Sequence, residues 1–325
     1  MLTWPALSQL RRSWSEAEIH VLVAASNAEI ARLCPSIDGV IPDPGDDASA
    51  AGQAALRAEL REHRFDASIT LLAGGRISWH LFRAGIPYRL APASKAAALL
   101  HTHRLVQRRS RSAKSEFVYN QDLIGRFLED HGHAIVEPSG PPYLAFDEEE
   151  LRPLRERLRR EWGSGNRVLV VVHPGTGGSA SRIDLDRYAV LCQLLKGPRD
   201  LHFIISAGPG ERGLADGLSE RLGNLPHSIH DSTEGLAAYA RVLACCDVFI
   251  SGSTGTLHLA GALNLKTAGL HLPIGTATLL RWQPINDPSR NLSFSPPPEA
   301  DPSDPAGIDI AAAAAAISTR LLRNA

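Results

Sequence analysis

A glycine-rich loop after a buried, strand-like run is the first feature of this sequence that could do chemistry. The apolar run 168–172 leads into His-Pro-Gly-Thr-Gly-Gly at 173–178. Gly175 and Gly177 would let backbone N–H groups approach an anion closely, and the Thr176 hydroxyl adds a donor. A tight turn that needs positive φ would use the same residues, so this loop by itself leaves both interpretations open.

A second loop places hydroxyl groups at the start of a helix. The strand-like run 248–251 is followed by Ser253, Thr254 and Gly255, and His258 lies one helical turn after Thr254 on the same face. The amides and the dipole of a helix N-terminus favour a phosphate, to which the His258 imidazole could also donate. The alternative is a capping hydroxyl and a histidine that packs within the helix.

A third loop follows the strand-like run 201–206 and places Glu211 at the start of a helix. A carboxylate just beyond a strand can accept hydrogen bonds from the two hydroxyls of a ribose. It can also simply complement the dipole of the helix. Because three such loops occur in one half of the chain, each at the carboxyl end of a predicted strand, together they predict a site for a nucleotide diphosphate.

The other half of the chain contains a basic segment. Between residues 104 and 114 there are five basic side chains and no acidic one, namely Arg104, Arg108, Arg109, Arg111 and Lys114. Guanidinium groups bind carboxylates and phosphates in a bidentate manner, so the segment could hold an acidic acceptor or lie against anionic lipid head groups. A solvated face is the alternative interpretation.

The elements that must position these loops alternate along the chain. Short runs rich in Val and Ile are separated by stretches of helical period, a pattern typical of parallel sheets covered by helices on both faces. We expect strands at 19–24, 67–72, 87–90, 168–172, 201–206, 248–251 and 267–271. We expect an N-terminal helix, a closing helix around 311–316, and helices at 49–63, 76–84, 93–103, 115–130, 147–162, 184–196, 210–222, 234–244 and 255–263.

A segment rich in proline and glycine divides the two series of elements. Gly140, with the prolines around it, cannot continue a regular element, so we expect a linker there. The expected domains are 1–145, which would carry the acceptor side, and 146–325, which would bind the nucleotide. Ligands of open α/β sheets bind at the carboxyl ends of the strands, so the chemistry is expected where the two domains face each other across a cleft.

Composition excludes several classes of protein. The 325 residues include 34 basic and 35 acidic side chains, a net charge of -1, so no overall field attracts nucleic acid. The four cysteines lack Cys-x-x-Cys spacing and indicate a reducing, cytoplasmic protein. No signal peptide, membrane-length apolar run, zinc spacing, P-loop or Gly-x-Ser-x-Gly motif is present, so we expect neither a metal nor another cofactor.

Several of these motifs resemble those of glycosyltransferase family 9, the ADP-heptose lipopolysaccharide heptosyltransferases. The HPGTGG run with Ser181, Arg182, Ile183 and Tyr188 resembles that family's HPG loop, and STGTLHLAGAL at 253–263 resembles its (D/S)(S/T)GxxHLAAAL signature. The likeness extends over roughly residues 2–285 and includes AGIPYRL at 84–90, the RR...K.E..YN pattern through Lys114, Glu116, Tyr119 and Asn120, and Arg281-Trp282.

The resemblance implies a fold, a reaction and roles for residues. The fold would be two Rossmann-like domains of the glycosyltransferase B type. The reaction would be an inverting, metal-independent transfer of heptose or a related sugar from an ADP-sugar to a lipopolysaccharide core acceptor, which is lipid-linked and acidic, at the cytoplasmic face of the inner membrane. By position, the donor contacts would be Gly175, Thr176, Gly177, Glu211 at the ribose, and Ser253, Thr254, Gly255 and His258 at the diphosphate. Ser181 and Arg182 stand where the family often has a lysine, so Arg182 would supply that charge, and Arg104, Arg108, Arg109 and Lys114 would face the acceptor.

The start of the chain departs from the family pattern. Family members open with a strand and a Gly-Asp loop before a helix like MLTWPAL at 1–7, and the aspartate is the natural general base. Strand and aspartate would lie upstream of Met1, so we expect an N-terminal sheet without its first, central strand. The alternatives are a catalytically inactive nucleotide-sugar binding protein without that base, and a nucleotide-sugar epimerase or hydrolase on the same fold.

Overall fold

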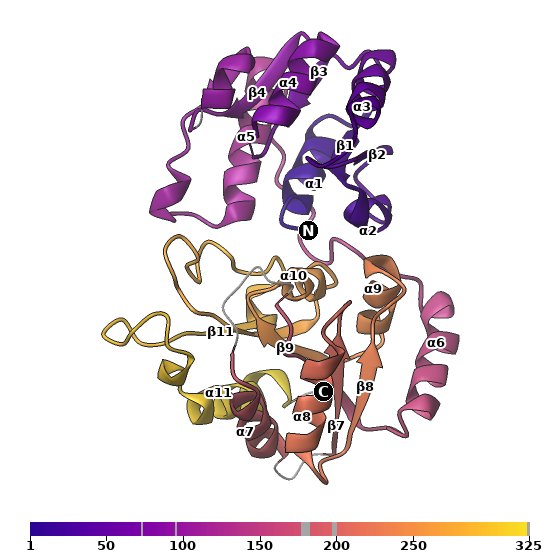
Figure 1. The fold of residues 1–325 in the computed structure, drawn as a ribbon, viewed down its shortest axis with the longest axis vertical. Helices are drawn as coiled ribbons and strands as arrows, with labels where there is room; N and C mark the ends of the chain where they lie inside the picture. The colour runs from indigo at the N-terminus through magenta and orange to yellow at the C-terminus, as the bar shows by residue number, and fades with distance from the viewer. Residues whose placement is uncertain (73, 95, 177–182, 197–199, 324–325) are drawn as a thin grey trace. The chain divides into compact units, whose positions relative to one another are not determined.

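The chain forms two compact units, each built from parallel strands that alternate with helices. A computed structural model describes residues 1–72, 74–94, 96–176, 183–196 and 200–323. The units are Leu2–Ser139 and Gly140–Ala325 (Figure 1). The α/β class predicted from the alternation of apolar runs and helical stretches is therefore confirmed.

The N-terminal unit contains two separate parallel sheets. β1 (His20–Ala24) pairs with β2 (Gly39–Asp43), and β4 (Tyr88–Pro92) pairs with both β3 (Ala67–Ile69) and β5 (His103–Leu105). The α-helices of this unit are α1 (Trp4–Ser13), α2 (Ala28–Arg32), α3 (Ala50–Glu62), α4 (Gly75–Ala84) and α5 (Glu116–Asp130).

These two sheets correspond to the two sides of one doubly wound sheet. Such a sheet usually has the strand order 3-2-1-4-5-6, with the first strand at its centre. Here β2 and β1 take the places of strands 3 and 2, and β3, β4 and β5 take the places of strands 4, 5 and 6. No described strand takes the place of strand 1, between β1 and β3. Within the described residues, the N-terminal unit is thus divided into a two-stranded and a three-stranded sheet.

Helices hold the two sheets together on both faces. On one face Leu56 of α3 and Leu81 of α4 share a core with Ile41 of β2. On the other face Leu10 of α1 and Leu123 of α5 pack with residues that include Ile19 and Leu90. Helices therefore pack against both sheets of this unit and form two separate apolar clusters.

The C-terminal unit contains a complete doubly wound sheet. Its strands are all parallel and lie in the order β11-β10-β9-β6-β7-β8. They are β6 (Val168–His173), β7 (Leu201–Ala207), β8 (His227–Asp231), β9 (Val248–Gly252), β10 (Lys266–Leu270) and β11 (Asn291–Phe294). The helices are α6 (Glu148–Glu161), α7 (Leu185–Lys196), α8 (Arg212–Leu222), α9 (Leu236–Ala244), α10 (Gly255–Ala262) and α11 (Ile310–Ala316), which continues as a π-helical turn to Leu321.

The core of this unit lies on both faces of the central strands. β6, β7 and β9 are buried almost throughout because α7, α8 and α11 cover one face and other helices cover the second. The core residues include Val170, Leu191, Phe203, Leu218 and Ile250. This packing fixes the carboxyl ends of β9, β6 and β7, from which the predicted loops emerge.

The expected elements agree with the structure except in a few places. The helix expected at 93–103 is wrong, because Ala96–Leu100 forms only a short 3-10 helix and β5 begins at His103. Pairing of His103 with Leu90 in the sheet outweighs the helical propensity of the alanine run. The helix α2 and the strands β2, β5, β8 and β11 were not expected. Within the residues that the structure describes, no helix has both the length and the apolar character needed to cross a membrane.

Candidate functional site

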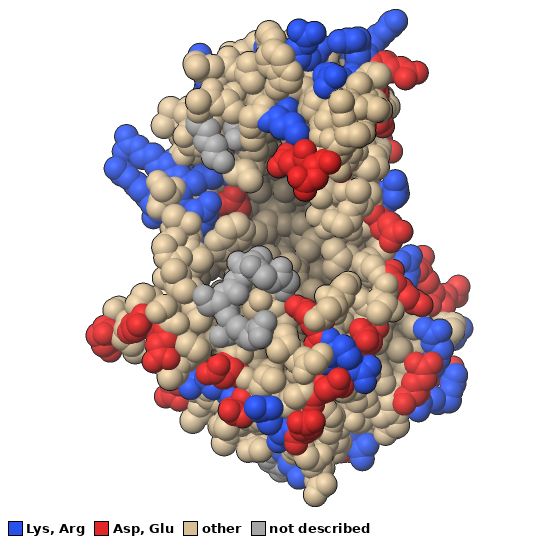
Figure 2. Space-filling model, viewed as in Figure 1, with Lys and Arg blue, Asp and Glu red and all other residues tan. Residues whose placement is uncertain are grey.

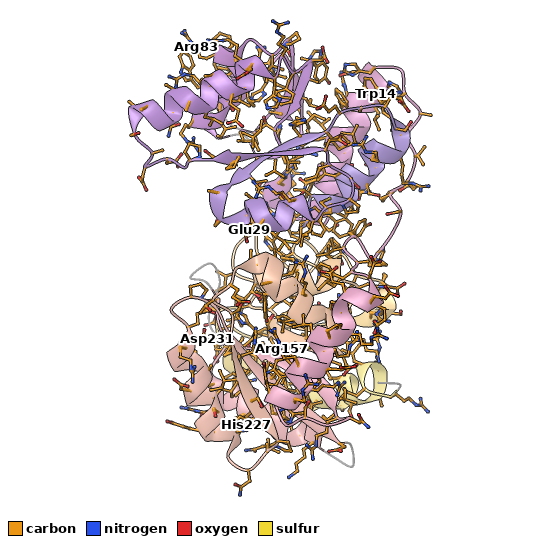
Figure 3. The ribbon with its side chains drawn as sticks, turned by 90° about the vertical axis from the view of Figure 1, so that its right-hand side faces the viewer. Trp14, Glu29, Arg83, Arg157, His227 and Asp231 are labelled. Carbon is orange, nitrogen blue, oxygen red and sulfur yellow. The ribbon has the colours of Figure 1, made fainter. Side chains whose placement is uncertain are left out.

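The three predicted loops meet because their strands are neighbours. β6 pairs with β9 on one side and with β7 on the other, so the loops after His173, Ala207 and Gly252 leave the same edge of the sheet. Figure 3 marks this direction on β8, which runs from His227 to Asp231. The strand order reverses between β6 and β9, and open α/β sheets bind ligands at this switch point.

In the first loop, Gly175 lies directly against the Glu211 side chain of the third loop. A Cβ atom on Gly175 would overlap with the Glu211 carboxylate, so this position has room for glycine alone while Glu211 keeps its place. Gly175 is not among the glycines with positive φ, which means that it provides space rather than a left-handed turn. Thr176 follows and is buried. Gly177, Ser181 and Arg182, which we also expected in the donor site, lie outside the described residues.

Glu211 stands at the entry of α8 but does not cap it. Its side chain turns back, and Oε2 accepts a hydrogen bond of 3.0 Å from the N–H of Gly208. His173 Nε2 lies 3.6 Å from the same oxygen. The carboxylate is 15% exposed, so it is held between two loops and still reaches the surface of the site.

A hydrogen-bonded chain behind Glu211 was not predicted. The Tyr239 hydroxyl donates to Ser206 Oγ at 2.8 Å, and Ser206 Oγ lies 3.0 Å from His173 Nδ1. Burial lowers the pKa of His173, so its ring is neutral near pH 7. His173 belonged to a recognised motif, but nothing in the local sequence connects it with a serine on β7 and a tyrosine on α9.

The second loop leads into α10, and one of its hydroxyls caps the helix, as the capping interpretation predicted. Thr254 is the N-cap, and its Oγ1 accepts from the N–H of Leu257 at 3.3 Å. Ser253 precedes it and is half-buried, while Gly255 is the exposed first residue of the helix. The capping role of Thr254 is therefore confirmed, and the first turn of α10 opens at the same sheet edge as the other two loops.

Two buried histidines stand at this edge with one ring nitrogen each unsatisfied. Nδ1 of His258 and Nε2 of His271 have no hydrogen-bond partner among the described residues. Burial lowers the pKa of His258 to about 3 and that of His271 to about 4, so both rings are neutral near pH 7. A buried polar atom without a partner costs about 1–3 kcal/mol, which a ligand that pairs with it would recover.

The basic segment of the N-terminal unit contains two kinds of side chain. Arg109 is buried, where it forms an ion pair of 2.5 Å with Glu116 and donates to Gln107 Oε1. Lys114 is exposed and pairs with Asp122 at 2.9 Å. Figure 2 shows the clustered basic side chains of this unit.

The other two residues predicted to bind the acceptor differ from Arg109 and Lys114 in their ion pairing. Arg104 and Arg108 are exposed, and neither forms an ion pair with any residue that the structure describes. They are therefore available for an acidic partner, whereas Arg109 holds the segment to α5.

The candidate site contains no cluster that would hold a metal. Within the described ranges, no three side chains among His, Cys, Asp and Glu come together in a suitable arrangement. All four cysteines are buried and carry free thiols. The described polar groups of the three loops include amides, hydroxyls, imidazoles and the Glu211 carboxylate, which suit a ligand that offers both phosphates and hydroxyls.

Comparison with known sequences gives a consistent family. Residues 53–303 match the model of glycosyltransferase family 9, described as heptosyltransferase. A protein of Haemophilus influenzae named "Putative glycosyltransferase" is 39% identical over 301 residues, which cover 91% of this chain and 86% of that protein.

Solved structures show the same fold at low sequence identity. A family 9 glycosyltransferase of Veillonella parvula superposes with a TM-score of 0.81 at 16% identity, covering 99% of this chain and 94% of that one. An Escherichia coli heptosyltransferase solved with ADP gives 0.75 at 17% identity, with coverage of 98% and 95%. Escherichia coli ADP-heptose heptosyltransferase II gives 0.70 at 17% identity, with coverage of 90% and 85%. The family model, the curated relative and the fold agree, and this chain belongs to glycosyltransferase family 9, the heptosyltransferase family.

Proposed function

We propose that this glycosyltransferase moves heptose or a related sugar from an ADP-sugar donor to a lipopolysaccharide core acceptor, with inversion and without a metal. The observation that carries the proposal is the meeting of three loops at the switch point of the C-terminal sheet. Related structures add support, since one Escherichia coli heptosyltransferase was solved with ADP and with ADP-2-deoxy-2-fluoro heptose.

The polar groups of this edge suit the two ends of a nucleoside diphosphate. The Glu211 carboxylate would accept from the ribose hydroxyls. The first turn of α10, Thr176 and His258 would lie at the diphosphate, where amides and the helix dipole favour negative charge. We assign Gly175, Gly177, Ser181, Arg182, Ser253, Thr254 and Gly255 to the same donor contacts.

The proposed transfer exchanges one bond at the anomeric carbon for another. The acceptor hydroxyl attacks this carbon from the face opposite the diphosphate and loses its proton to a general base. The bond between the anomeric carbon and the phosphate oxygen breaks, and ADP leaves with the electron pair. Fixed N–H groups and an imidazole donor stabilise the charge that develops on the leaving diphosphate, a task that a metal ion performs in other enzymes.

The acceptor would be held by the N-terminal unit. Arg104 and Arg108 would bind acidic groups of the lipid-linked sugar, beside the predicted contacts Arg109 and Lys114. Leu99 and Val106 are close in sequence to these arginines and are 77% and 75% exposed. Exposed apolar side chains beside arginines suit the surface of an anionic bilayer, so we propose that this segment touches the cytoplasmic face of the inner membrane.

Titration calorimetry and a transfer assay test the proposal. The chain should bind ADP more tightly than UDP or GDP, and ADP-heptose with a core acceptor should yield ADP and one glycosylated product of inverted configuration. Binding of ADP without any transfer to core acceptors would indicate a nucleotide-sugar binding protein. Release of free sugar without an acceptor would indicate a hydrolase, and failure to bind any nucleotide would refute the proposed site.

A further inference from the structure

A chain of buried polar side chains links α9, β7 and β6 to the Glu211 carboxylate. The Tyr239 hydroxyl donates to Ser206 Oγ at 2.8 Å, and this oxygen is 3.0 Å from His173 Nδ1. His173 Nε2 lies 3.6 Å from Glu211 Oε2 on its other side. Tyr239, Ser206 and His173 are at most 5% exposed, so the protein rather than bulk water determines where their protons lie.

The order of donors indicates which nitrogen of His173 carries the proton. The Tyr239 hydroxyl occupies Ser206 Oγ as its acceptor, so the serine hydroxyl can donate its own proton, and His173 Nδ1 is within reach. The ring is neutral because burial lowers the pKa of His173, and a neutral ring has a single N–H. The main-chain carbonyl of Ser206, 3.1 Å from the same nitrogen, would accept from an N–H on Nδ1, but that tautomer would turn the Nε2 lone pair toward the Glu211 carboxylate 3.6 Å away. With Nδ1 accepting from the serine hydroxyl, the N–H is on Nε2 and faces Glu211.

We propose that His173 is a positioning residue for ribose recognition, which holds the Glu211 carboxylate through its Nε2–H. The separation of 3.6 Å is longer than a hydrogen bond, so the effect is the attraction between an N–H dipole and an ionised carboxylate in a buried setting. Together with the Gly208 N–H, it fixes the side chain against Gly175, ready to accept from the ribose hydroxyls. This inference rests on the proposed function, because it requires that Glu211 binds a ribose.

The Ser206 hydroxyl should therefore determine whether His173 attracts or repels the Glu211 carboxylate. The main-chain carbonyl of Ser206 lies 3.1 Å from His173 Nδ1 and can only accept. In Ser206→Ala the serine donor is gone, and Nδ1 gains a proton to donate to that carbonyl. Nε2 then presents a lone pair to the carboxylate, so attraction becomes repulsion although neither His173 nor Glu211 has changed.

Binding of two nucleotides to a set of variants tests the inference. Calorimetry would compare ADP with 2′,3′-dideoxy-ADP, which lacks the ribose hydroxyls. Ser206→Ala and His173→Leu should weaken ADP about tenfold and dideoxy-ADP less than about twofold, the loss expected for one polar interaction. His173→Gln keeps an N–H near the Nε2 position and should retain part of the ADP affinity.

A matched control and a spectroscopic readout separate positioning from support of the fold. The Ser228 hydroxyl is hydrogen-bonded to His202 Nε2 at 2.9 Å. Ser228 follows His227 at the start of β8, the end of the strand away from the loops (Figure 3). Ser228→Ala should leave both nucleotide affinities unchanged. Nitrogen NMR of the imidazole should show Nε2–H for His173 in the wild type and Nδ1–H in Ser206→Ala.

The outcomes distinguish this inference from the proposed function. Equal weakening of both nucleotides, or an unchanged tautomer in Ser206→Ala, would overturn the positioning role. The variant Glu211→Gln should itself weaken ADP and spare dideoxy-ADP. If it does so while Ser206→Ala and His173→Leu do not, the inference alone fails, and if Glu211→Gln weakens neither nucleotide, the ribose contact of the proposed function fails. Should His173→Leu not fold, Ser206→Ala carries the test.

Discussion

Gly175→Ala is expected to damage nucleotide binding while leaving the fold intact. The new methyl group would overlap with the Glu211 carboxylate, far inside the 3.4 Å at which ordinary van der Waals contact begins. The carboxylate is the far end of a flexible side chain, so it can move away at little cost. Since Gly175 does not have positive φ, alanine fits the backbone there, and the three atoms nearest to the new Cβ all belong to the Glu211 carboxylate.

The size of the effect follows from the interaction that is lost. A hydrogen bond to a charged group contributes about 1.5–3 kcal/mol, so displacing Glu211 from the ribose should weaken ADP about 10- to 150-fold. The melting temperature should change little, because no core contact is removed. Loss of affinity with unchanged stability is the signature that separates this prediction from a general packing defect.

A double-mutant cycle measured by titration calorimetry checks the reasoning. In a Glu211→Ala background there is no carboxylate to displace, so Gly175→Ala should have almost no further effect on ADP affinity. Gly213→Ala serves as a matched control, because a Cβ at Gly213 meets nothing within 4 Å. Wild-type affinity in Gly175→Ala, or full additivity in the double variant, would refute the role given to Gly175.

Three further predictions address other parts of the molecule. His258→Ala should weaken ADP by about 1–3 kcal/mol in calorimetry, and unchanged affinity would remove His258 from the site. The unfolded chain protonates His258 and His271 as the pH falls through 6.5, whereas the folded chain does so only near pH 3 and 4. The unfolded state therefore binds more protons in that window, and the free energy of unfolding should fall with decreasing pH by about 1.4 kcal/mol per pH unit for each ring. Thermal melts of His271→Gln should show a smaller slope between pH 6.5 and 4, and an unchanged slope would contradict the assignment. Arg104→Glu with Arg108→Glu should reduce sedimentation with anionic vesicles, and equal binding to neutral vesicles would argue against an electrostatic contact.

In the C-terminal unit, the strands that the sequence revealed are those in the interior of the sheet. β6, β7 and β9 lie under helices on both faces, so every residue except His173 and His202 is apolar or small, and the run is visible without context. β8 and β11 lie at the two edges of the same sheet, and β2 and β5 at edges in the N-terminal unit. Their exposed positions tolerate polar residues and proline, as in β2 with Pro42, which removes the apolar pattern.

The candidate site was predictable where one stretch of chain supplies both the motif and its geometry. Thr254 caps α10 three residues before the amide that it binds, a relation that is readable from spacing. Glu211 against Gly175 and Ser206 against His173 are contacts between loops of neighbouring strands. Those contacts depend on the order of strands in the sheet, which a sequence pattern does not contain.

The division of the N-terminal sheet has a consequence for how this protein opens and associates. In the part of the chain that the structure describes, β1 and β3 each have a neighbouring strand on one side only, and both are partly exposed along their length, unlike the buried β9. Amide protons on their unpaired sides lack the ladder that protects a central strand, so they should exchange with deuterium well before those of β6 and β9. Such edges also attract other extended chains, so the unpaired sides of β1 and β3 are where self-association of residues 1–325 through strand pairing would begin.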